Sequence, residues 1–406
     1  MTMPIDNKSL CSVFIVLIIM VSLCSVIIVH ETTGESKTDV QGEYNILARV
    51  NTEGSGIYIK DTVLSAKGGV SAFYNTSTFE ITEADNKAAW GGLVVGTPGA
   101  ATIQHVQMQQ IAEKAGLIFT LYQDGMSTDG DHMYYVATMS NAATVTGYTG
   151  QLDAGILWEP QYSKIINTDG FSQLVLTNDL FPNHTCCNIV GVKDYISSHK
   201  DVTERVLAAY VKAAKYVDYA VNHVGSDEYN ELVDICQDVV GAAIDVSTIK
   251  DALSTITYVY ADDDKGTLNG LKSDVADLAD SLIDMGLLRH NLADLGFNYS
   301  SQFANAFVDE GYLTNAVKRL DADDPTLAGA NAIVTIAVIA GDIHQIAIHV
   351  ANALGYFTDN HITVNISAAT NGPGVAVAVQ NGTAQFGVLG APPATSTAIN
   401  GMLVHA

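Results

Sequence analysis

The feature that most constrains the fold is the repeated alternation of short apolar runs with longer amphipathic stretches. Apolar runs span residues 93–96, 153–158 and 333–339, and helical periodicity follows one at about 101–114 and recurs at 202–221. Strands that alternate with helices in this way are typical of βαβ units and parallel sheets. The run at 333–339 is almost continuously apolar, as expected of a strand buried on both faces. The sequence therefore predicts an α/β fold.

Turns rich in glycine and proline recur beside these strands and helices. They are Gly54-Ser55-Gly56, Thr97-Pro98-Gly99, Gly341-Asp342, Gly372-Pro373-Gly374 and Gly390-Ala391-Pro392-Pro393. Each turn by itself is ordinary loop chemistry. In open α/β sheets, however, ligands bind outside the carboxyl ends of the strands, where free backbone N–H groups and helix dipoles favour anions. Several such turns in one chain point to a ligand site at their meeting point.

The charge balance excludes one class of partner. The 406 residues include 44 acidic and 19 basic side chains, for a net charge of −25. Nucleic-acid binding requires a basic surface, so we expect no nucleic-acid partner. The acidity is typical of a solvated surface, and the length suits two or three compact units.

A membrane anchor is predicted at the N-terminus. Residues 11–29 carry no charge and are long enough to cross a bilayer. A cleaved signal is the alternative, but Leu23 stands where a lipoprotein signal before Cys24 needs a small residue. Lys8 precedes the span and Glu31 follows it, which predicts a single-pass protein of the cell membrane with its body outside the cytoplasm. Residues 1–30 are thus the expected anchor and residues 31–43 a polar tether.

The motifs in the body of the chain resemble those of a known family. One block comprises Gly341-Asp342-Ile343-His344, Ala353-Leu354-Gly355-Tyr356-Phe357, Gly372-Pro373 and Phe386 to Pro393; the other comprises Asn51 to Gly56, Gly96 to Gly99, Leu157 to Pro160 and Pro182 to Cys187. Together they resemble the nitrate/sulfonate/taurine-type solute-binding proteins of ABC importers, whose fold is shared with thiamine-pyrimidine synthases. The resemblance implies a two-lobed, periplasmic-binding-protein-like (type II) fold that closes on a small ligand. It also implies an ABC permease and its ATPase as partners.

The two blocks occur in reversed order relative to that family. The C-terminal block looks like the start of the family domain, which predicts a circular permutation; a fragment of a tandem array is the alternative. The expected division is residues 44–90 as part of lobe one with a connection, 91–195 as lobe two, 196–326 as a helical part on lobe one, and 327–406 as the rest of lobe one.

The resemblance also implies a set of cleft residues. They are Thr52, Gly54, Ser55, Ala101, Thr102, Trp158, Glu159, Asn183, His184, His344, Gly372, Pro373, Ala391 and Pro392. No Lys or Arg occurs within these motifs, whereas Glu53, Glu159 and Asp342 do. An anionic ligand such as nitrate or a sulfonate would therefore rely on backbone amides, and a zwitterion or a weakly cationic thiamine precursor is an open alternative.

Two other functions are weighed against transport. His184-Thr185-Cys186-Cys187 superficially resembles the cysteine-rich metal segment of the thiamine-pyrimidine synthases. Adjacent cysteines do not readily chelate one metal together, and the fuller cysteine cluster is missing, so we expect no metal, no cofactor and no enzyme activity. A membrane-tethered sensory domain without transport is the remaining alternative.

Overall fold

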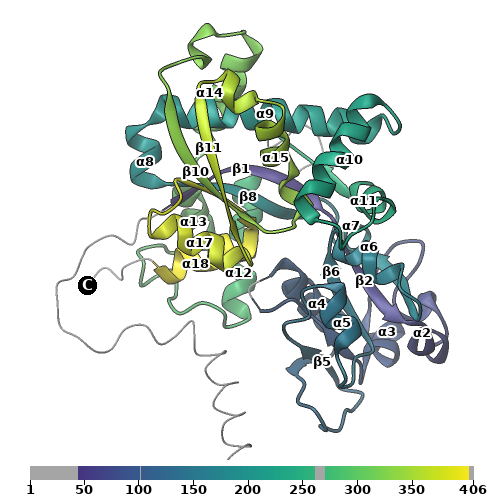
Figure 1. Ribbon diagram of the computed structural model, residues 1–406. Coiled ribbons are helices and arrows are strands. Elements are labelled where there is room, and N and C mark those ends of the chain that lie inside the picture. The colour runs from purple at the N-terminus through teal and green to yellow at the C-terminus, as the bar shows by residue number, and fades with distance from the viewer. Residues whose placement is uncertain (1–43, 101, 261–269, 402–406) are drawn as a thin grey trace, which may run out of the picture. The chain divides into compact units, whose positions relative to one another are not determined.

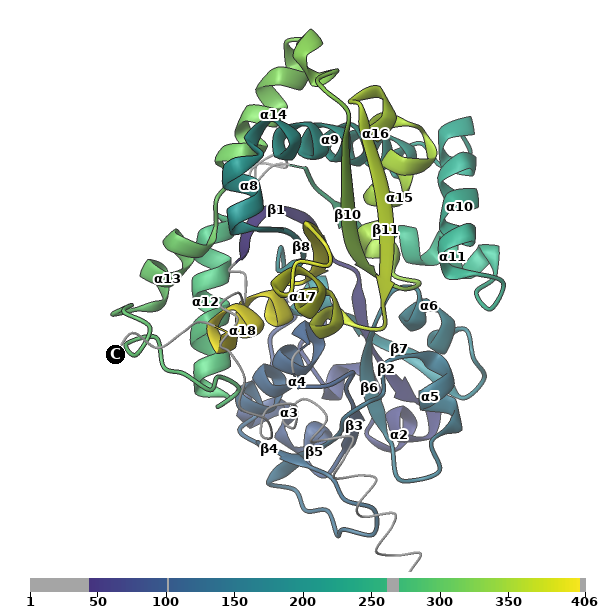
Figure 2. The same ribbon diagram turned by 60° about the vertical axis from the view of Figure 1, so that its left-hand side comes forward.

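Two six-stranded sheets organise the computed structural model, which describes residues 44–100, 102–260 and 270–401. The first sheet has the order β11-β10-β12-β8-β1-β9. Its strands are β1 (Tyr44–Glu53), β8 (Thr185–Val192), β9 (Ile256–Tyr258), β10 (Ala332–Ile339), β11 (Ile362–Ala369) and β12 (Phe386–Gly390). The strands β10, β11 and β12 are parallel, and β8 joins them to β1 and β9 through antiparallel pairs. Strands β10 and β11 run side by side in both views (Figures 1 and 2).

The second sheet has the order β4-β5-β3-β6-β2-β7. Its strands are β2 (Ser55–Lys60), β3 (Val94–Gly96), β4 (Ile118–Leu121), β5 (His132–Val136), β6 (Ala154–Trp158) and β7 (Phe171–Leu176). The pairs among β4, β5, β3 and β6 are parallel, whereas β2 pairs antiparallel with both β6 and β7. The structure thus has the α/β fold, with two sheets, that the alternation in the sequence predicts.

Helices cover both faces of the first sheet. They are α8 (Lys193–Ser198), α9 (Lys200–Asn222), α10 (Asp227–Val240), α11 (Val246–Leu253), α12 (Leu271–Asp284), α13 (Ser300–Phe307), α14 (Gly311–Asp321), α15 (Ile346–Ala353), α16 (Tyr356–Asp359), α17 (Gly372–Gln380) and α18 (Ala391–Gly401). One apolar cluster joins α9, α10, α11 and α15 to the sheet, and a second joins α12, α13, α17 and α18 to it. Because strand side chains alternate between faces, these two clusters are the cores on the two sides of the sheet.

Shorter helices accompany the second sheet and the connections. They are α2 (Asp61–Ala66), α3 (Glu83–Trp90), α4 (Ile103–Lys114), α5 (Ala142–Gly147), α6 (Gln161–Ile166) and α7 (Thr177–Leu180), with 3₁₀ turns at Val70–Ala72, Pro325–Leu327 and Ile343–Gln345. Apolar clusters again lie on both sides of the sheet.

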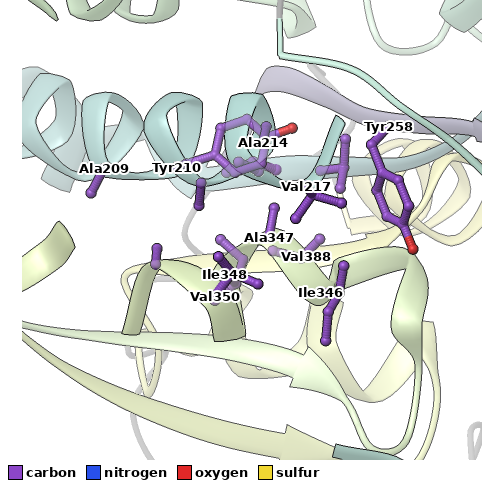
Figure 3. Packing of buried hydrophobic residues seen from close by; sticks show 14 of the residues in the cluster. Ala209, Tyr210, Ala214, Val217, Tyr258, Ile346, Ala347, Ile348, Val350 and Val388 are labelled. Carbon is purple, nitrogen blue, oxygen red and sulfur yellow. The ribbon is translucent and has the colours of Figure 1, made fainter. Parts of the chain in front are cut away.

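The packing of α9 against α15 forms the centre of the first core (Figure 3). Small residues such as Ala209 and Ala214 on α9 are fully or almost fully buried, which lets the backbones of the two helices approach each other. Two tyrosines bring hydroxyl groups into this core, and each hydroxyl donates a hydrogen bond to a backbone carbonyl there. Tyr210 donates a 2.6 Å hydrogen bond to the Val259 carbonyl, and Tyr258 donates a 3.0 Å bond to the Ile343 carbonyl. These hydrogen bonds join the apolar packing to the end of β9 and to the 3₁₀ turn at Ile343–Gln345.

The first and last described segments of the chain pack together. The Tyr44 hydroxyl donates a 2.7 Å hydrogen bond to the Ala394 carbonyl in α18. Tyr44, Ala398 and Ile399 share one apolar cluster. The C-terminal strands β10–β12 are therefore an integral part of the sheet that contains β1.

The sheets divide the chain differently from the expected ranges at three points. Residues 55–60 form β2 in the second sheet rather than in lobe one, and residues 185–192 form β8 in the first sheet rather than in lobe two. The segment 256–258, expected within a helical part, is the edge strand β9. Strand partners come from distant segments, so periodicity along the chain does not reveal them.

No helix in the described ranges is long and apolar enough to cross a membrane, and the anchor predicted at residues 11–29 lies outside these ranges.

Replacing Phe386 in β12 tests whether the C-terminal block is integral to the fold. Phe386 is fully buried, with its ring 5.8 Å from that of Tyr195. We expect Phe386→Ala to lower the free energy of unfolding by about 3–5 kcal/mol, because it leaves a cavity in the core. Urea unfolding followed by circular dichroism measures this change.

A matched control is Val377→Ala on α17, whose side chain is 53% exposed. Its effect should stay within about 0.5 kcal/mol. A loss of less than about 1 kcal/mol for Phe386→Ala would contradict an integral C-terminal block.

Candidate functional site

A pocket of about 540 Å³ opens where loops from the two sheets meet. Residues that follow the parallel strands β10, β11 and β12 line it, and so do residues that follow β3, β5 and β6. From the first sheet these include Gly341, Asp342, Thr370, Asn371 and Gly390; from the second they include Pro98, Thr138, Ser140, Asn141 and Gln161. The pocket therefore lies at the carboxyl ends of both sets of parallel strands, where open α/β sheets bind ligands.

Three helices of eight or more residues begin at this pocket. Residues at the starts of α4, α17 and α18 line its wall. Thr102 caps α4 by accepting a hydrogen bond from the His105 N–H, and Asn371 caps α17 by accepting one from the Gly374 N–H. Each helix start carries a partial positive charge. The first turn of α4 also has backbone N–H groups without intrahelical partners, whereas Pro373 in α17 and Pro392 and Pro393 in α18 have no N–H. The wall is therefore electropositive, although no Lys or Arg is among the described residues that line it.

His344 and Asp342 form a buried ion pair at the pocket wall. Its Nδ1 lies 2.8 Å from Oδ1 of Asp342, and its Nε2 lies 2.9 Å from the Gly54 carbonyl oxygen. A carbonyl only accepts hydrogen bonds, so Nε2 carries a proton, and the carboxylate favours a second proton on Nδ1. Burial lowers the pKa of His344, but the neighbouring Cys186 and Asp342 outweigh it and raise the pKa to about 10. His344 is therefore an imidazolium, paired with Asp342.

The Gly54 carbonyl lies in the connection between the two sheets. It lies between β1 and β2 and also accepts a 2.9 Å hydrogen bond from the Glu159 N–H. Gly54 has a φ of +84°, and a Cβ there would sit 2.3 Å from His344 Nε2. Only glycine provides both the backbone conformation and the room for this contact. The positively charged ring thus binds the connection between the sheets as well as lining the pocket.

Buried hydrogen bonds also hold the second connection, between α7 and β8. Asn183 has a positive φ of 61°, and its N–H donates a 3.0 Å bond to the Glu53 carboxylate. The Thr257 hydroxyl donates a 2.9 Å bond to the other oxygen of Glu53. The Glu53 carboxylate thus joins the first connection to the second connection and to β9 by hydrogen bonds.

Five of the residues implied by the family resemblance line the pocket: Thr102, Trp158, His344, Gly372 and Pro373. Four others lie at or beside the connection between β1 and β2. They are Thr52 in β1, Gly54 in the connection, Ser55 in β2, and Glu159, whose N–H donates to the Gly54 carbonyl. Ser55 accepts a 2.9 Å hydrogen bond from the Gln104 side chain. Glu159 is fully buried and accepts bonds from Ser163 and Thr255, and burial raises its pKa. These two side chains serve the local structure.

The remaining implied residues lie elsewhere. Ala391 and His184 line a separate cavity of about 200 Å³. Asn183 belongs to the second connection, Pro392 is buried in the first turn of α18, and Ala101 is outside the described residues.

Several lining residues were not among those the resemblance implied. Gln104, Ser140, Asn141, Gln161 and Asn371 all stand within a few residues of a strand end or a helix start. A rule that took every polar residue just after a strand would have included most of them. Cys186 and Cys187 also line the pocket, at the start of β8. Their position depends on strand pairing, which no local signal shows.

No metal centre is formed by the described side chains. No three His, Cys, Asp or Glu residues within 44–100, 102–260 and 270–401 are arranged to hold a metal ion. The arrangement fits capture of a small ligand by hydrogen bonds and fixed positive charge.

Comparison with known families matches two segments of the chain. The sequence profile of the NMT1-like family matches residues 21–228, and that of the NMT1/THI5 like family matches residues 343–405. Comparison with curated proteins yields no match.

Comparison with solved structures gives two partial matches. The periplasmic nitrate-binding protein NrtA from Synechocystis PCC 6803 is 16% identical, with a TM-score of 0.48 over 70% of this chain and 69% of that one. The ligand-binding component of an ABC-type import system from Staphylococcus aureus, with zinc bound, is 13% identical, with a TM-score of 0.39 over 68% and 75%.

The charge on His344 predicts a pH dependence of stability. Its folded pKa of about 10 lies above the ordinary value of 6.5, so the stabilisation is complete below pH 6.5 and is lost as the pH rises to about 10. We expect His344→Gln to cost about 3–5 kcal/mol at pH 6, because it leaves the buried Asp342 carboxylate without its charge partner. The difference from the unchanged protein should shrink toward pH 10. Urea unfolding across this pH range measures it.

His132→Gln is a matched control, because His132 forms a 2.7 Å pair with Asp129 in a partly exposed position. That change should cost less than about 1 kcal/mol. A cost of His344→Gln that stays constant from pH 6 to pH 10 would contradict a charged His344.

Proposed function

The chain belongs to the NMT1-like family, and from this premise we propose that it is the solute-binding component of an ABC importer for a small anion. The observation that carries the proposal is the convergence of three helix N-termini on one pocket at the strand ends. On this proposal the protein binds its ligand and delivers it to a permease driven by an ATPase. It acts by binding rather than by catalysis.

The charge pattern of the pocket favours an anion. Among the described residues that line it, none is Lys or Arg, and the one carboxylate, Asp342, is already held by His344 and Gln345. A helix N-terminus stabilises a bound anion by about 0.3–1 kcal/mol, and by up to about 2 kcal/mol where it is partly buried. Three such ends together contribute about 1–3 kcal/mol, and up to about 6 kcal/mol where all are partly buried, so further contacts with the ligand must supply the rest of the affinity. The net charge of −25 repels anions only at short range, because the Debye length is about 8 Å at physiological salt.

The size of the pocket favours an organic anion over an inorganic one. Its volume of about 540 Å³ lies within the range usual for small-molecule sites. A carboxylate or sulfonate group would occupy the electropositive side, and an organic tail would contact Trp158, Pro98 and Ile339 on the apolar side. A zwitterion such as an amino sulfonate fits the same scheme, since its anionic end uses the helix starts.

Closure of the pocket would involve the two connections between the sheets. Both are narrow, and both contain residues with positive φ, namely Glu53 and Gly54 in one and Asn183 in the other. Short connections of this kind absorb backbone rotation while the sheets stay rigid. We infer that the lobes close on the ligand about these connections.

The two tryptophans of the chain allow a direct test of ligand binding. Trp158 lines the pocket, whereas Trp90 is fully buried and donates a 2.8 Å hydrogen bond to the Phe73 carbonyl. Titration with alkanesulfonates, taurine, nitrate, bicarbonate, amino acids and thiamine precursors should give a saturable fluorescence change for at least one anionic or zwitterionic compound. Trp90→Phe should keep this signal, and Trp158→Phe should lose it while calorimetry still detects binding.

Choline serves as the cationic control in the same titration. Saturable binding of choline alone, or of no compound in the set, would contradict the proposed anion site.

We also propose that the chain is circularly permuted relative to its family. Two features support this proposal: β10–β12 pair into the same sheet as β1, and α18 packs beside Tyr44. Joining the end of α18 to the start of β1 would then restore the usual order of the family with little change in packing.

A relinked protein tests the permutation. In it, residues 327–406 precede residue 44 and join to it directly. We expect this protein to unfold in one cooperative transition and to bind the same ligand as the natural order. A relinked chain that stays unfolded while the natural order folds would contradict a permuted domain.

We retain the interpretation of residues 11–29 as a membrane anchor that holds the body outside the cytoplasm, because this segment is uncharged and of bilayer length. The full chain should then sediment with membranes after alkaline carbonate washing, and a protein that begins at residue 41 should not. Release of the full chain by carbonate would contradict an integral anchor.

A further inference from the structure

Cys186 and Cys187 lie side by side in the pocket wall because of an irregularity in β8. Cys187 pairs with Asn51, but Thr185 pairs with the next residue, Thr52, so Cys186 is an extra residue in the strand. Adjacent strand residues normally point to opposite faces, whereas a β-bulge turns two of them to the same side. Both cysteines accordingly belong to one apolar cluster, line the pocket, and have their Sγ atoms 3.9 Å apart.

The surroundings of the pair distinguish the two thiols. Both are free and buried, with 5% and 3% of their surface exposed. The hydrogen bond with Cys187 lowers the pKa of the Cys186 thiol, burial opposes this, and the charge of His344 lowers the pKa further. The same hydrogen bond and burial raise the pKa of the Cys187 thiol well above its ordinary value. Cys186 is therefore the better nucleophile of the two.

We propose that Cys186 and Cys187 form a thiol modification site in the pocket wall, at which a small organic disulfide converts the two thiols into a vicinal disulfide. The proposed function leaves this pair without a role, and no third metal-ligating side chain stands with it among the described residues. A reagent small enough for the pocket reaches the sulfurs from the ligand side.

The reaction is a balanced thiol–disulfide exchange. The Cys186 thiolate attacks one sulfur of the reagent, the S–S bond of the reagent breaks, and one thiol of the reagent leaves with the proton lost by Cys186. Cys187 then attacks Cys186 in the mixed disulfide and releases the second reagent thiol, which takes the proton of Cys187. The two protein thiols are oxidised and the reagent disulfide is reduced to two thiols.

The product is strained and is therefore readily reversed. The two Sγ atoms must approach from 3.9 Å to about 2.05 Å. Consecutive Cα atoms are about 3.8 Å apart, which is shorter than the separation of about 4.4–6.8 Å usual for a disulfide. Strained disulfides are easily reduced and are typical of regulatory sites.

Strain at this peptide bond is transmitted to the connection between the sheets. The Cys187 N–H donates a 3.2 Å hydrogen bond to Asn51 Oδ1, and Asn51 Nδ2 donates a 3.3 Å bond to the Glu53 carbonyl. Rotation of the Cys186–Cys187 peptide therefore displaces the end of β1 next to Gly54. We expect oxidation to weaken ligand capture, an effect that rests on the proposed function, whereas the oxidation itself does not.

Mass spectrometry of the full chain treated with bis(2-hydroxyethyl) disulfide tests the proposal. After alkylation under denaturing conditions, the peptide with both cysteines should be lighter by two hydrogen atoms and resist alkylation. Dithiothreitol should restore two alkylated cysteines. Cys236, which is fully buried in α10, is an internal control and should stay unmodified until the protein unfolds.

Two single variants separate the steps. Cys187→Ser should retain one reagent half as a mixed disulfide on Cys186, because nothing displaces it. Cys186→Ser should retain far less, because the Cys187 thiol is the poorer nucleophile. Titrating the oxidised and the reduced protein with the ligand then measures how much the vicinal disulfide lowers the affinity.

Three outcomes would overturn the proposal. They are two free thiols in the treated folded protein, a reaction only when Cys236 reacts as well, or a mixed disulfide in Cys186→Ser and none in Cys187→Ser. A protein that binds no anion but forms the vicinal disulfide would contradict the proposed function and leave the modification site intact.

Discussion

The arrangement of the site depends on the contacts of one side chain, His344. Its ring joins the Asp342 carboxylate, after β10, to the Gly54 carbonyl, between β1 and β2. These residues come from opposite ends of the sequence, so the contact exists only when the C-terminal strands complete the first sheet. Because the ring is buried, its charged form is stable only when both hydrogen-bond acceptors are in place. The His344 ring thus links the pocket wall to the connection between the two sheets, and it does so only when the C-terminal strands are in the first sheet.

Electropositive character at the pocket comes from the helix starts, because the charge of His344 is balanced by Asp342. The starts of α4, α17 and α18 are directed there by strands that end at the same edge of each sheet. Donors held by helices need no reorganisation when a ligand arrives, whereas a long cationic side chain would lose conformational freedom on binding. The same backbone donors tolerate different anionic groups. This arrangement makes the pocket electropositive although no Lys or Arg is among the described residues that line it.

The bulge in β8 places two thiols next to each other in the pocket wall. One extra residue brings Cys186 and Cys187 to the same face, beside His344 and the ligand space. Without the bulge one thiol would point to the opposite face of the sheet, into the other core. The hydrogen bonds of Asn51 connect this point to the connection between β1 and β2.

Much of the local structure is determined by the sequence itself. The strands expected at 93–96, 153–158 and 333–339 correspond to β3, β6 and β10, and the helix expected at 202–221 is α9. The turns at 97–99, 341–342 and 372–374 also lie at the pocket, because glycine, proline and capping residues act over a few positions along the chain. Thr102, Gly372 and His344 were named from the family resemblance, and they lie in or beside these turns.

Only the tertiary structure decided which strands share a sheet and which polar residues face the ligand. The pairing of β8 with β12 and of β2 with β6 depends on contacts between distant segments, which leave no periodic trace in either segment. Ser55 and Glu159 stand within recognisable motifs, yet their side chains bind Gln104, Ser163 and Thr255 instead of the pocket. Cys186 and Cys187 were adjacent in the sequence from the start, but the register of β8 against β1 placed both thiols in the pocket wall. Short-range chemistry determined the elements, and long-range pairing determined the site.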